Sequence, residues 1–367
     1  MPLSAKQTSK YLLVGSTKAY SGKSSIVLGM AQQFQLRGLD IAYGKPLGTC
    51  VSASQADGID EDVRFLGKTL NLPPNRLGQT LLFLEPETLE KRLQGFDRTD
   101  YKPLLAESLQ NLGGELIILE AGATLESGRL FELSVPQMAQ QIDASVLLVD
   151  RFHSLTEVGE LVGVKQRLGD RLLGVVLTDI PPESMSATET LARPFLEERG
   201  IPVFGMMPRS QLLRSVSVGE LASRLNAEVL CRRDRLDLMV ESLKIGAMNV
   251  NSALKYFSEG QNMAVVTGGD RTEIQLAALE TSTQCLILTG HVPPSPLIIT
   301  RAEEVEVPVL SVDLDTLTTV EAIEDALGHV RLQEPIKVEY MRKLMSQHFQ
   351  IEGAIAALGL ETAVTTP

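Results

Sequence analysis

The chain has 367 residues, of which 44% are hydrophobic and 22% charged, as in an ordinary globular protein long enough for two domains with their own cores. Its formal net charge of −12 and the lack of a basic stretch argue against a nucleic-acid partner, because phosphate backbones are bound by clustered lysine and arginine. Three scattered cysteines and four isolated histidines argue against a disulfide framework and against a zinc site.

The sequence also carries no sign of a membrane segment. The first residues, MPLSAKQTSK, hold no apolar core of signal-peptide length, and no apolar run approaches the ~20 residues of a membrane-spanning helix. We therefore expect a cytoplasmic protein with no membrane partner.

Short apolar runs alternate with helical stretches in the first part of the chain. Strands are predicted at Tyr11–Gly15, Ile41–Gly44, Glu115–Glu120, Ser145–Asp150, Leu172–Thr178 and Pro202–Gly205. Helices are predicted between them, for example over Lys23–Arg37 and Glu61–Leu70. Because these strands are continuously apolar and alternate with helices, the predicted fold class is α/β. We expect a doubly wound, mostly parallel sheet with ligands at the carboxyl ends of its strands.

The composition changes after about Arg209. Gln211–Leu230 reads as polar and helical, and the charged cluster Arg232–Arg235 suits a connector. A second series of strands follows, at Met263–Thr267, Cys285–Thr289 and Val307–Val312. We therefore predict a first domain over 1–215, a connector over 216–235, a second, smaller α/β domain over 236–355 and a tail over 356–367.

The segment Tyr11–Ser25, YLLVGSTKAYSGKSS, has the layout of a phosphate-binding loop. An apolar strand leads into small residues, then into Gly22–Ser25 (GKSS) and a helix. Backbone N–H groups in such a loop converge on an anion, Lys23 can offset phosphate charge and Ser24 can ligate magnesium. Thr17 stands where a standard Walker A motif has its first glycine. An ordinary strand-to-helix turn with a surface lysine is the alternative.

Charged side chains follow the other strands of the same sheet. Lys45 comes after the second strand, Glu120 ends the third, and a helix between them starts with Asp57, Asp60 and Asp62. Lysines and separated carboxylates are what a site for a magnesium nucleotide needs. The simpler alternatives are a solvated lysine and a helix start favoured by the macrodipole. A carboxylate that ends an apolar strand is costly, which favours a functional role for Glu120.

Taken together, these motifs resemble the dethiobiotin synthetase fold over roughly residues 10–215. The version they resemble most is the one at the N-terminus of long bacterial phosphate acetyltransferases. The matching pieces are Gly15 with Gly22-Lys23-Ser24, Tyr43–Pro46, Asp57-Gly58 with Asp62, Glu120–Gly122 and Gly205–Pro208.

The resemblance implies ATP and Mg²⁺ as cofactors and assigns roles to individual residues. The implied nucleotide-binding residues are Ser21, Gly22, Lys23, Ser24 and Ser25, with Thr178 and Pro208. The implied magnesium ligands are Ser24, Glu120 and Asp62, with Asp57 and Asp60 left open as alternatives to Asp62. The implied catalytic residues are Lys23, Lys45 and Thr49, where Lys45 would handle a phosphorylated intermediate.

Two departures from the ligase pattern bear on substrate and base. The chain reads Glu120–Thr124 (EAGAT) where the ligases have a glycine-rich segment, which affects the substrate pocket. Thr178, followed by Asp179, stands where the ligases have an adenine-facing asparagine. A hydroxyl cannot offer the paired donor and acceptor of an amide, so the preferred base stays open.

The second domain contains a short signature, Gly268-Gly269-Asp270-Arg271-Thr272-Glu273. A glycine turn followed by a capping box, with Asp270 as the cap, explains most of it. Arg271 is not explained in this way, because a positive charge is unfavourable at a helix N-terminus. An arginine beside glycine amides suits an anion, so Gly269, Asp270 and Arg271 are the predicted effector-binding residues.

Residues 235–350 resemble the DRTGG domain, which follows the same N-terminal domain in those acetyltransferases. The matching pieces are Gly269–Arg271, Leu286–Gly290 and Val309–Val312 with Asp315 and Thr316. The resemblance implies regulation. Because the sequence ends at residue 367, we expect no acetyltransferase domain and no transfer of acetyl groups to phosphate.

Three functions are compatible with these features. The first is a regulatory protein whose first domain binds Mg–ATP and is coupled to a second domain that senses a small anionic effector or mediates assembly. A homo-oligomer is expected by analogy with its relatives. The second is an ATP-dependent ligase of the dethiobiotin synthetase type, acting on a carboxylate or carbamate near Lys45 and Thr49. The third is an interaction scaffold with a relic P-loop, which Thr17 supports.

Overall fold

The computed structural model describes residues 10–48, 58–110, 112–290, 292–330, 332 and 334–361. The chain forms two compact units. The first unit comprises residues 1–209 and 338–367, and the second comprises residues 210–337. Of the predicted site residues, Thr49 and Asp57 lie outside the described residues.

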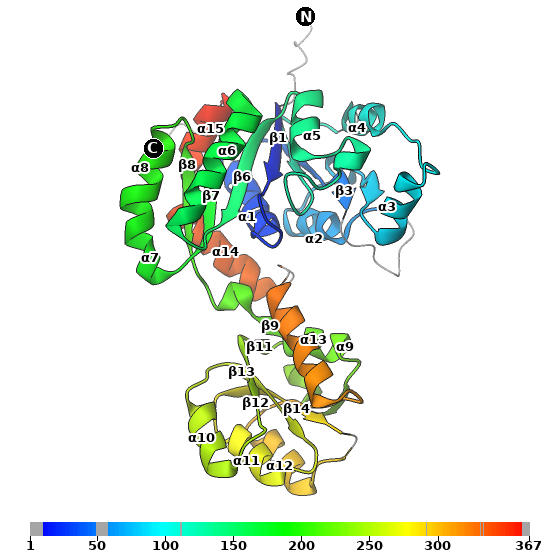
Figure 1. The fold of residues 1–367 in the computed structure, drawn as a ribbon, viewed down its shortest axis with the longest axis vertical. Helices are drawn as coiled ribbons and strands as arrows, with labels where there is room; N and C mark the ends of the chain where they lie inside the picture. Colours follow the sequence, from blue (N-terminus) through cyan, green and yellow to red (C-terminus); the bar gives the residue numbers. More distant parts are fainter. Residues whose placement is uncertain are drawn as a thin grey trace, which may run out of the picture. The chain divides into compact units, whose positions relative to one another are not determined.

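The first unit is built on a six-stranded sheet of order β2-β5-β1-β6-β7-β8, and every neighbouring pair in it is parallel. Its strands are β1 (Lys10–Gly15), β2 (Ile41–Gly44), β5 (Leu116–Glu120), β6 (Ser145–Arg151), β7 (Leu172–Ile180) and β8 (Val203–Pro208). The interior of each strand is buried, because helices cover both faces. The doubly wound parallel sheet predicted from the continuous apolar runs is confirmed (Figure 1).

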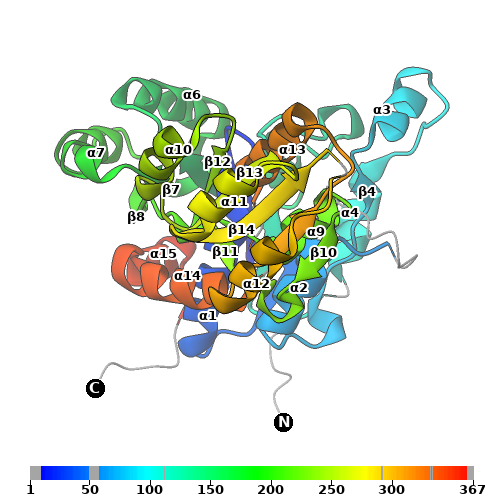
Figure 2. The same cartoon turned by 90° about the horizontal axis from the view of Figure 1, so that it is seen from below.

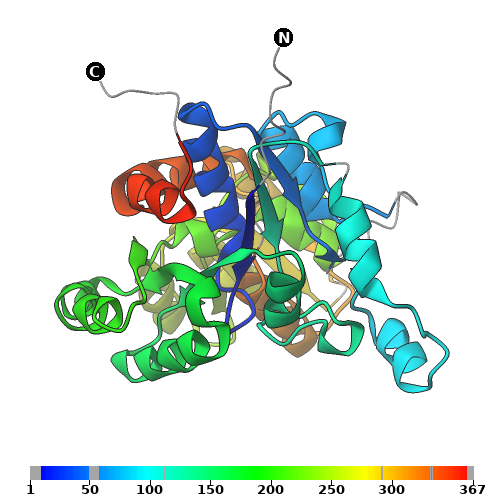
Figure 3. The same cartoon turned by 90° about the horizontal axis from the view of Figure 1, so that it is seen from above.

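Helices of the first unit lie on both faces of this sheet. They are α1 (Lys23–Leu36), α2 (Glu61–Thr69), α3 (Pro86–Leu93), α4 (Tyr101–Gln110), α5 (Val135–Gln141), α6 (Val158–Leu168), α7 (Pro182–Ala187) and α8 (Arg193–Glu197). A short parallel pair, β3 (Leu47–Gly48) and β4 (Leu82–Phe83), stands apart from the main sheet. Viewed from above, α5 and α6 lie on the face opposite to α1 (Figure 3).

The C-terminal segment completes the first unit. The boundary between the units falls inside α14 (Pro335–His348), and α15 (Ile351–Leu358) packs against α1, β7 and β8. Lys10 Nζ donates to the carbonyls of Leu358 and Gly359 at 2.5 and 2.6 Å, where a cation favours a helix C-terminus. Residues 338–355, which we placed in the second domain, therefore fold with the first.

The second unit is a smaller α/β layer structure. Its sheet has the order β10-β15-β14-β13-β12, and only the β10–β15 pair is antiparallel. The strands are β10 (Glu228–Cys231), β12 (Ser242–Ile245), β13 (Met263–Gly268), β14 (Thr283–Thr289) and β15 (Val309–Ser311). A second, two-stranded sheet pairs β9 (Val216–Ser217) with β11 (Met239–Val240).

Five helices enclose the larger sheet of this unit, which Figure 2 shows from below. They are α9 (Val218–Arg224), α10 (Val250–Ser258), α11 (Thr272–Leu279), α12 (Pro296–Glu304) and α13 (Thr316–Gly328). Side chains from α10, α11 and α12 form one core cluster, and side chains from α9 and α13 form another. The sheet is thus buried from both sides.

The prediction of one polar helix over Gln211–Leu230 is wrong. The segment holds β9, α9 and β10, and α9 begins at Ser217, whose hydroxyl accepts a hydrogen bond from the Glu220 N–H at 3.2 Å. β10 is a half-exposed edge strand, and its apolar run, Val229–Cys231, is too short to stand out from the surrounding sequence. Residues 216–235 are therefore part of the second unit, where we expected a connector.

Two helical glycines test how α1 packs within the first unit. A Cβ at Gly29 in α1 would lie 2.2 Å from Met345 Cγ, whereas Gly163 in α6 has no neighbour within 4 Å. We expect Gly29→Ala to lower the free energy of unfolding by about 1–3 kcal/mol through overpacking. Gly163→Ala should raise it by about 0.5–1 kcal/mol, because alanine favours the helix. Denaturant unfolding followed by circular dichroism measures both, and equal effects of the two changes would contradict this packing.

Candidate nucleotide-binding site

The phosphate-binding loop joins β1 to α1. Gly22 is the N-cap of α1 and has a φ of 85°, a left-handed conformation that glycine adopts without strain. No side chain caps the helix, so its first backbone N–H groups are left for another acceptor. The sequence thus places a helix N-terminus, with its positive end, at the carboxyl edge of the sheet.

Lys23 is buried although it carries a positive charge. Its side chain is 8% exposed, and Nζ lies 3.0 Å from Ser16 Oγ and 3.4 Å from the Ala123 carbonyl. Within the described part of the chain, Lys23 forms no ion pair. Burial lowers the pKa of Lys23, although the carboxylate of Glu120 opposes that effect. The ammonium group is therefore placed to receive an anion.

Glu120 joins the loop to its neighbouring strands. Ser24 Oγ donates to Glu120 Oε1 at 2.8 Å, and the Tyr43 hydroxyl donates to Oε2 at 2.9 Å. Glu120 is 3% exposed, and burial raises the pKa of its carboxyl group while the ammonium of Lys45 opposes that rise. A hydroxyl oxygen and a carboxylate oxygen, both possible ligands for a cation, thus lie side by side at the start of α1.

Lys45 is paired with two carboxylates from the start of α2. Nζ lies 2.5 Å from Asp62 Oδ2 and 3.2 Å from Asp60 Oδ1. Burial lowers the pKa of Lys45, but the nearby carboxylates, Glu120 foremost, raise it above its usual value. Asp60 is also the N-cap of α2 and accepts a hydrogen bond from the Asp62 N–H at 2.9 Å. Lys45, with 3% exposure, is not a solvated lysine.

The donors around Lys23 fit a magnesium ion only if a phosphate helps to hold it. Mg²⁺ prefers oxygen ligands and keeps several waters or phosphate oxygens in its shell. Ser24 and Glu120 supply such oxygens, whereas Asp62 is engaged by Lys45. Among the residues described, no group of three or more His, Cys, Asp or Glu side chains could hold a metal by itself. This donor set is typical of a nucleotide-dependent cation site.

Thr178 contacts the loop from β7, which is separated from β1 by β6. Its hydroxyl donates to the Ser21 carbonyl at 2.7 Å, and its side chain is buried. Pro208, also predicted in the nucleotide set, is the last residue of β8 and pairs with Ile180. Ser25 is half-buried in the first turn of α1. Of these residues, Thr178 has a structural contact that the sequence did not indicate.

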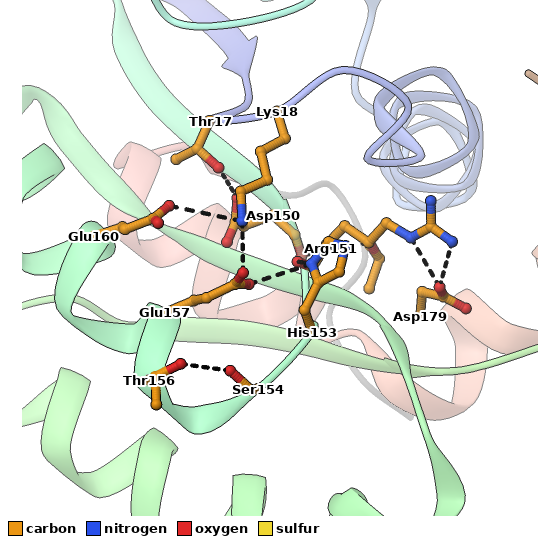
Figure 4. A network of polar contacts seen from close by, with 11 residues as sticks. Thr17, Lys18, Asp150, Arg151, His153, Ser154, Thr156, Glu157, Glu160 and Asp179 are labelled. Atoms are coloured by element: carbon orange, nitrogen blue, oxygen red, sulfur yellow. Dashed lines mark hydrogen bonds and ion pairs between the residues drawn. The ribbon is translucent and has the colours of Figure 1, made fainter. Parts of the chain in front are cut away.

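Sequence reasoning missed a polar network on the other side of the loop, which Figure 4 shows. The Thr17 hydroxyl donates to the buried carboxylate of Asp150, the second-last residue of β6. Lys18 Nζ lies 2.7 Å from Glu157 Oε1, just before α6, and 3.9 Å from Glu160 Oε2. Burial raises the pKa of Asp150, while the hydrogen bond from Thr17 opposes the rise. A carboxylate at the end of an apolar strand, the signal that identified Glu120, also marks Asp150.

In the second unit, Arg271 holds two loops together. Nη1 donates to the Gly246 carbonyl and Nη2 to the Met248 carbonyl, both at 2.6 Å. Arg271 is also the N-cap position of α11, with no side-chain cap, so the predicted capping box with Asp270 as the cap is wrong. A stabilising contact with backbone carbonyls explains why an arginine is tolerated at this helix start.

The last complete helix of the second unit, α13, has a carboxylate cap. The helix after β15 begins at Thr316, and Asp315 caps it by accepting a hydrogen bond from the Thr318 N–H at 3.0 Å. Asp315 is a good cap because its ionised carboxylate is a strong acceptor beside the helix dipole.

Models of two known domain families match the chain. The model of the family described as CobQ/CobB/MinD/ParA nucleotide binding domain matches residues 12–222. The chain belongs to this family. The model of the DRTGG domain matches residues 220–326. The predicted P-loop domain and DRTGG domain are thus confirmed.

The curated relatives are larger proteins. The chain is 25% identical over 311 residues to a phosphate acetyltransferase of Synechocystis, covering 80% of the chain and 43% of the relative. It is 23% identical over 368 residues to a phosphate acetyltransferase of Nitratidesulfovibrio vulgaris, covering 93% and 50%. The chain therefore spans about half the length of the curated relatives it matches, and the homology is to their N-terminal region.

One solved structure with a DRTGG domain was also found. It is the regulatory region of a Clostridium perfringens pyrophosphatase, with CBS and DRTGG domains, in complex with diadenosine tetraphosphate. It is 21% identical, covers 46% of this chain and 85% of its own, and gives a TM-score of 0.29. Separately, among the residues with described positions, no helix is both long and apolar enough to cross a membrane.

Removing the charge of Lys45 should destabilise the first unit. In Lys45→Met, the fully buried Asp60 carboxylate loses its ammonium partner, and the free energy of unfolding should fall by about 3 kcal/mol. The matched change Lys18→Met breaks a partly exposed pair and should cost less than about 1 kcal/mol. Urea unfolding compares the two variants. Adding Asp60→Asn to Lys45→Met should recover part of the loss, and a Lys45→Met variant as stable as the wild type would contradict the pairing.

Proposed function

We propose that the chain is a regulatory protein whose first unit binds Mg–ATP and whose DRTGG unit responds to that binding. The observation that carries the proposal is the buried ammonium of Lys23 at the N-terminus of α1, which forms no ion pair with any residue whose position is described. A buried charge without a partner is unfavourable. A nucleoside triphosphate would supply negative charge at a place where the backbone N–H groups at the start of α1 also point.

Each part of the nucleotide has candidate partners in the first unit. Lys23 and the amides of Ser21–Ser25 would bind the phosphates, and Ser24 and Glu120 would hold magnesium. The ion would offset phosphate charge and orient the phosphate chain. Lys45, held by Asp60 and Asp62, adds a fixed positive charge beside Glu120. Preorganised charge of this kind is what phosphoryl groups require.

The chain path supports coupling between the units. The second unit is inserted between β8 and the C-terminal helices of the first, so the chain leaves the first unit directly after Arg209. The Arg209 side chain contacts Asp179 at 3.1 Å, and its N–H donates to the Ile180 carbonyl at 2.7 Å. A nucleotide at the ends of β7 and β8 would act on the residue that precedes the second unit.

In the second unit we propose that a small anion binds at the Gly268–Gly269 turn, with Gly269 and Asp270 nearest to it. Arg271 would take part only by leaving the Gly246 and Met248 carbonyls, to which it now donates. Assembly into a homo-oligomer is proposed by analogy with the family.

Calorimetric titration with ATP, with and without magnesium, tests nucleotide binding. Lys23→Ala should weaken binding at least about 100-fold, since each 1.4 kcal/mol is tenfold in affinity. Ser24→Ala should remove the enhancement by magnesium while leaving magnesium-free binding in place. Lys91→Ala, which changes an exposed ion pair on α3, is the matched control and should bind as the wild type does. A wild-type protein that binds no ATP would contradict the proposal.

Hydrogen exchange tests the coupling. Saturating Mg–ATP should change the exchange of backbone amides in the second unit, above all in β13 and α11, because ordering at Arg209 would be transmitted along the chain. The change should vanish in Lys23→Ala. Protection confined to residues 10–209, with ATP bound, would show that the units respond independently.

A further inference from the structure

Charged side chains that the proposed nucleotide site does not use lie at or near the ends of three adjacent strands, β6, β7 and β8. Arg151 ends β6, Asp179 lies near the end of β7 and Arg209 follows β8. The Arg151 guanidinium lies 2.8 Å from Asp179 Oδ2, and Arg209 Nε lies 3.1 Å from Asp179 Oδ1. Figure 4 shows Arg151 and Asp179 turned toward each other. One carboxylate is thus shared by two guanidinium groups.

The cluster keeps a surplus of positive charge. Taken by themselves, Arg151, Arg209 and Asp179 carry two positive charges and one negative charge, a net charge of about +1. Arg209 uses Nε for Asp179, and within the described residues its two outer nitrogens form no ion pair. The side chains of Arg151 and Arg209 are 26% and 35% exposed, so a ligand can reach them. A guanidinium with free donors is suited to binding phosphate through two parallel hydrogen bonds.

The position of the cluster relative to the loop is fixed by Thr178. Thr178 donates to the Ser21 carbonyl of the loop, and Asp179 is the next residue. Asp179 has a φ of 57°, a left-handed conformation that is uncommon outside glycine and is maintained where the local structure requires it. This backbone turn brings the carboxylate between the arginines of the neighbouring strands.

We propose that Arg151 and Arg209 form a second phosphate subsite, for a nucleotide that carries a phosphate on its ribose as well as on its 5′ position. This inference rests on the proposed nucleotide binding. The 5′ phosphates would lie on the amides of Ser21–Ser25, so a second phosphate at the ends of β6–β8 must come from the nucleoside side of the ligand. The ribose 2′ and 3′ hydroxyls are the positions from which such a group extends.

Calorimetry on the full chain in the presence of magnesium tests this subsite. The probes are ADP, adenosine 2′-phosphate 5′-diphosphate and adenosine 3′-phosphate 5′-diphosphate. We expect one of the doubly phosphorylated nucleotides to bind about 10-fold more tightly than ADP, as one added charge-assisted contact gives. If ADP binds and neither added phosphate improves affinity, the subsite is overturned while nucleotide binding stands. If no nucleotide binds, both proposals fail.

Variants test whether the added affinity for the second phosphate comes from Arg151 and Arg209. In Arg151→Gln with Arg209→Gln, the affinity ratio between the ribose-phosphorylated nucleotide and ADP should fall to about one. Asp179→Asn removes the competing carboxylate and should raise the ratio, an effect that loss of folding cannot mimic. Arg98→Gln, in the loop after α3, should keep the wild-type ratio. A ratio that is the same in all variants would overturn the assignment to these arginines.

Discussion

The buried ammonium group of Lys23, which contacts no carboxylate within the described part of the chain, is the feature around which the proposed site is arranged. Among the described residues, the hydrogen-bond partners of Lys23 Nζ are two neutral oxygens, from Ser16 and Ala123. Both carboxylate oxygens of Glu120, which could have paired with it, accept hydrogen bonds from Ser24 and Tyr43. The charge is therefore compensated only at longer range, which is unfavourable in a poorly solvated place and becomes favourable when an anion arrives.

Lys45 differs from Lys23 in having carboxylates in direct contact. Lys45 is buried to a similar degree, yet it contacts Asp60 and Asp62 directly. The phosphate-binding loop before Lys23 is braced by β6 and β7, through Thr17 with Asp150 and through Thr178 with Ser21. A braced loop has little conformational entropy left to lose on binding, so the electrostatic gain from an anion is retained.

Much of the fold could be predicted from the sequence because the central strands are continuous apolar runs. Features that depend on contacts between distant segments of the chain could not be predicted in this way. The edge strand β10 is half-exposed, and its apolar run is limited to Val229–Cys231. The C-terminal residues 338–358 return to the first unit, and no local pattern shows with which sheet a helix will pack.

The candidate site likewise has residues that the sequence predicts and contacts that it does not. The GKSS sequence and the strand ends led directly to Lys23, Ser24, Glu120 and Lys45, which the structure brings together. The contacts of Lys18 and Arg271 could not be predicted from the sequence. Lys18 pairs with Glu157, which lies far along the chain, and Arg271 donates to backbone carbonyls, which no sequence pattern marks. The spacing that identifies a phosphate-binding loop says nothing about which neighbours hold it in place.

The stability of Lys23→Met, with and without Mg–ATP, tests the central claim most directly. Methionine keeps much of the side-chain volume and removes the buried charge. Without nucleotide, the account predicts that this variant unfolds at the same temperature as the wild type or a higher one, because an unfavourable charge has been removed. Mg–ATP should then raise the unfolding temperature of the wild type alone. A variant that is clearly less stable than the wild type without nucleotide, and still stabilised by Mg–ATP, would contradict the account.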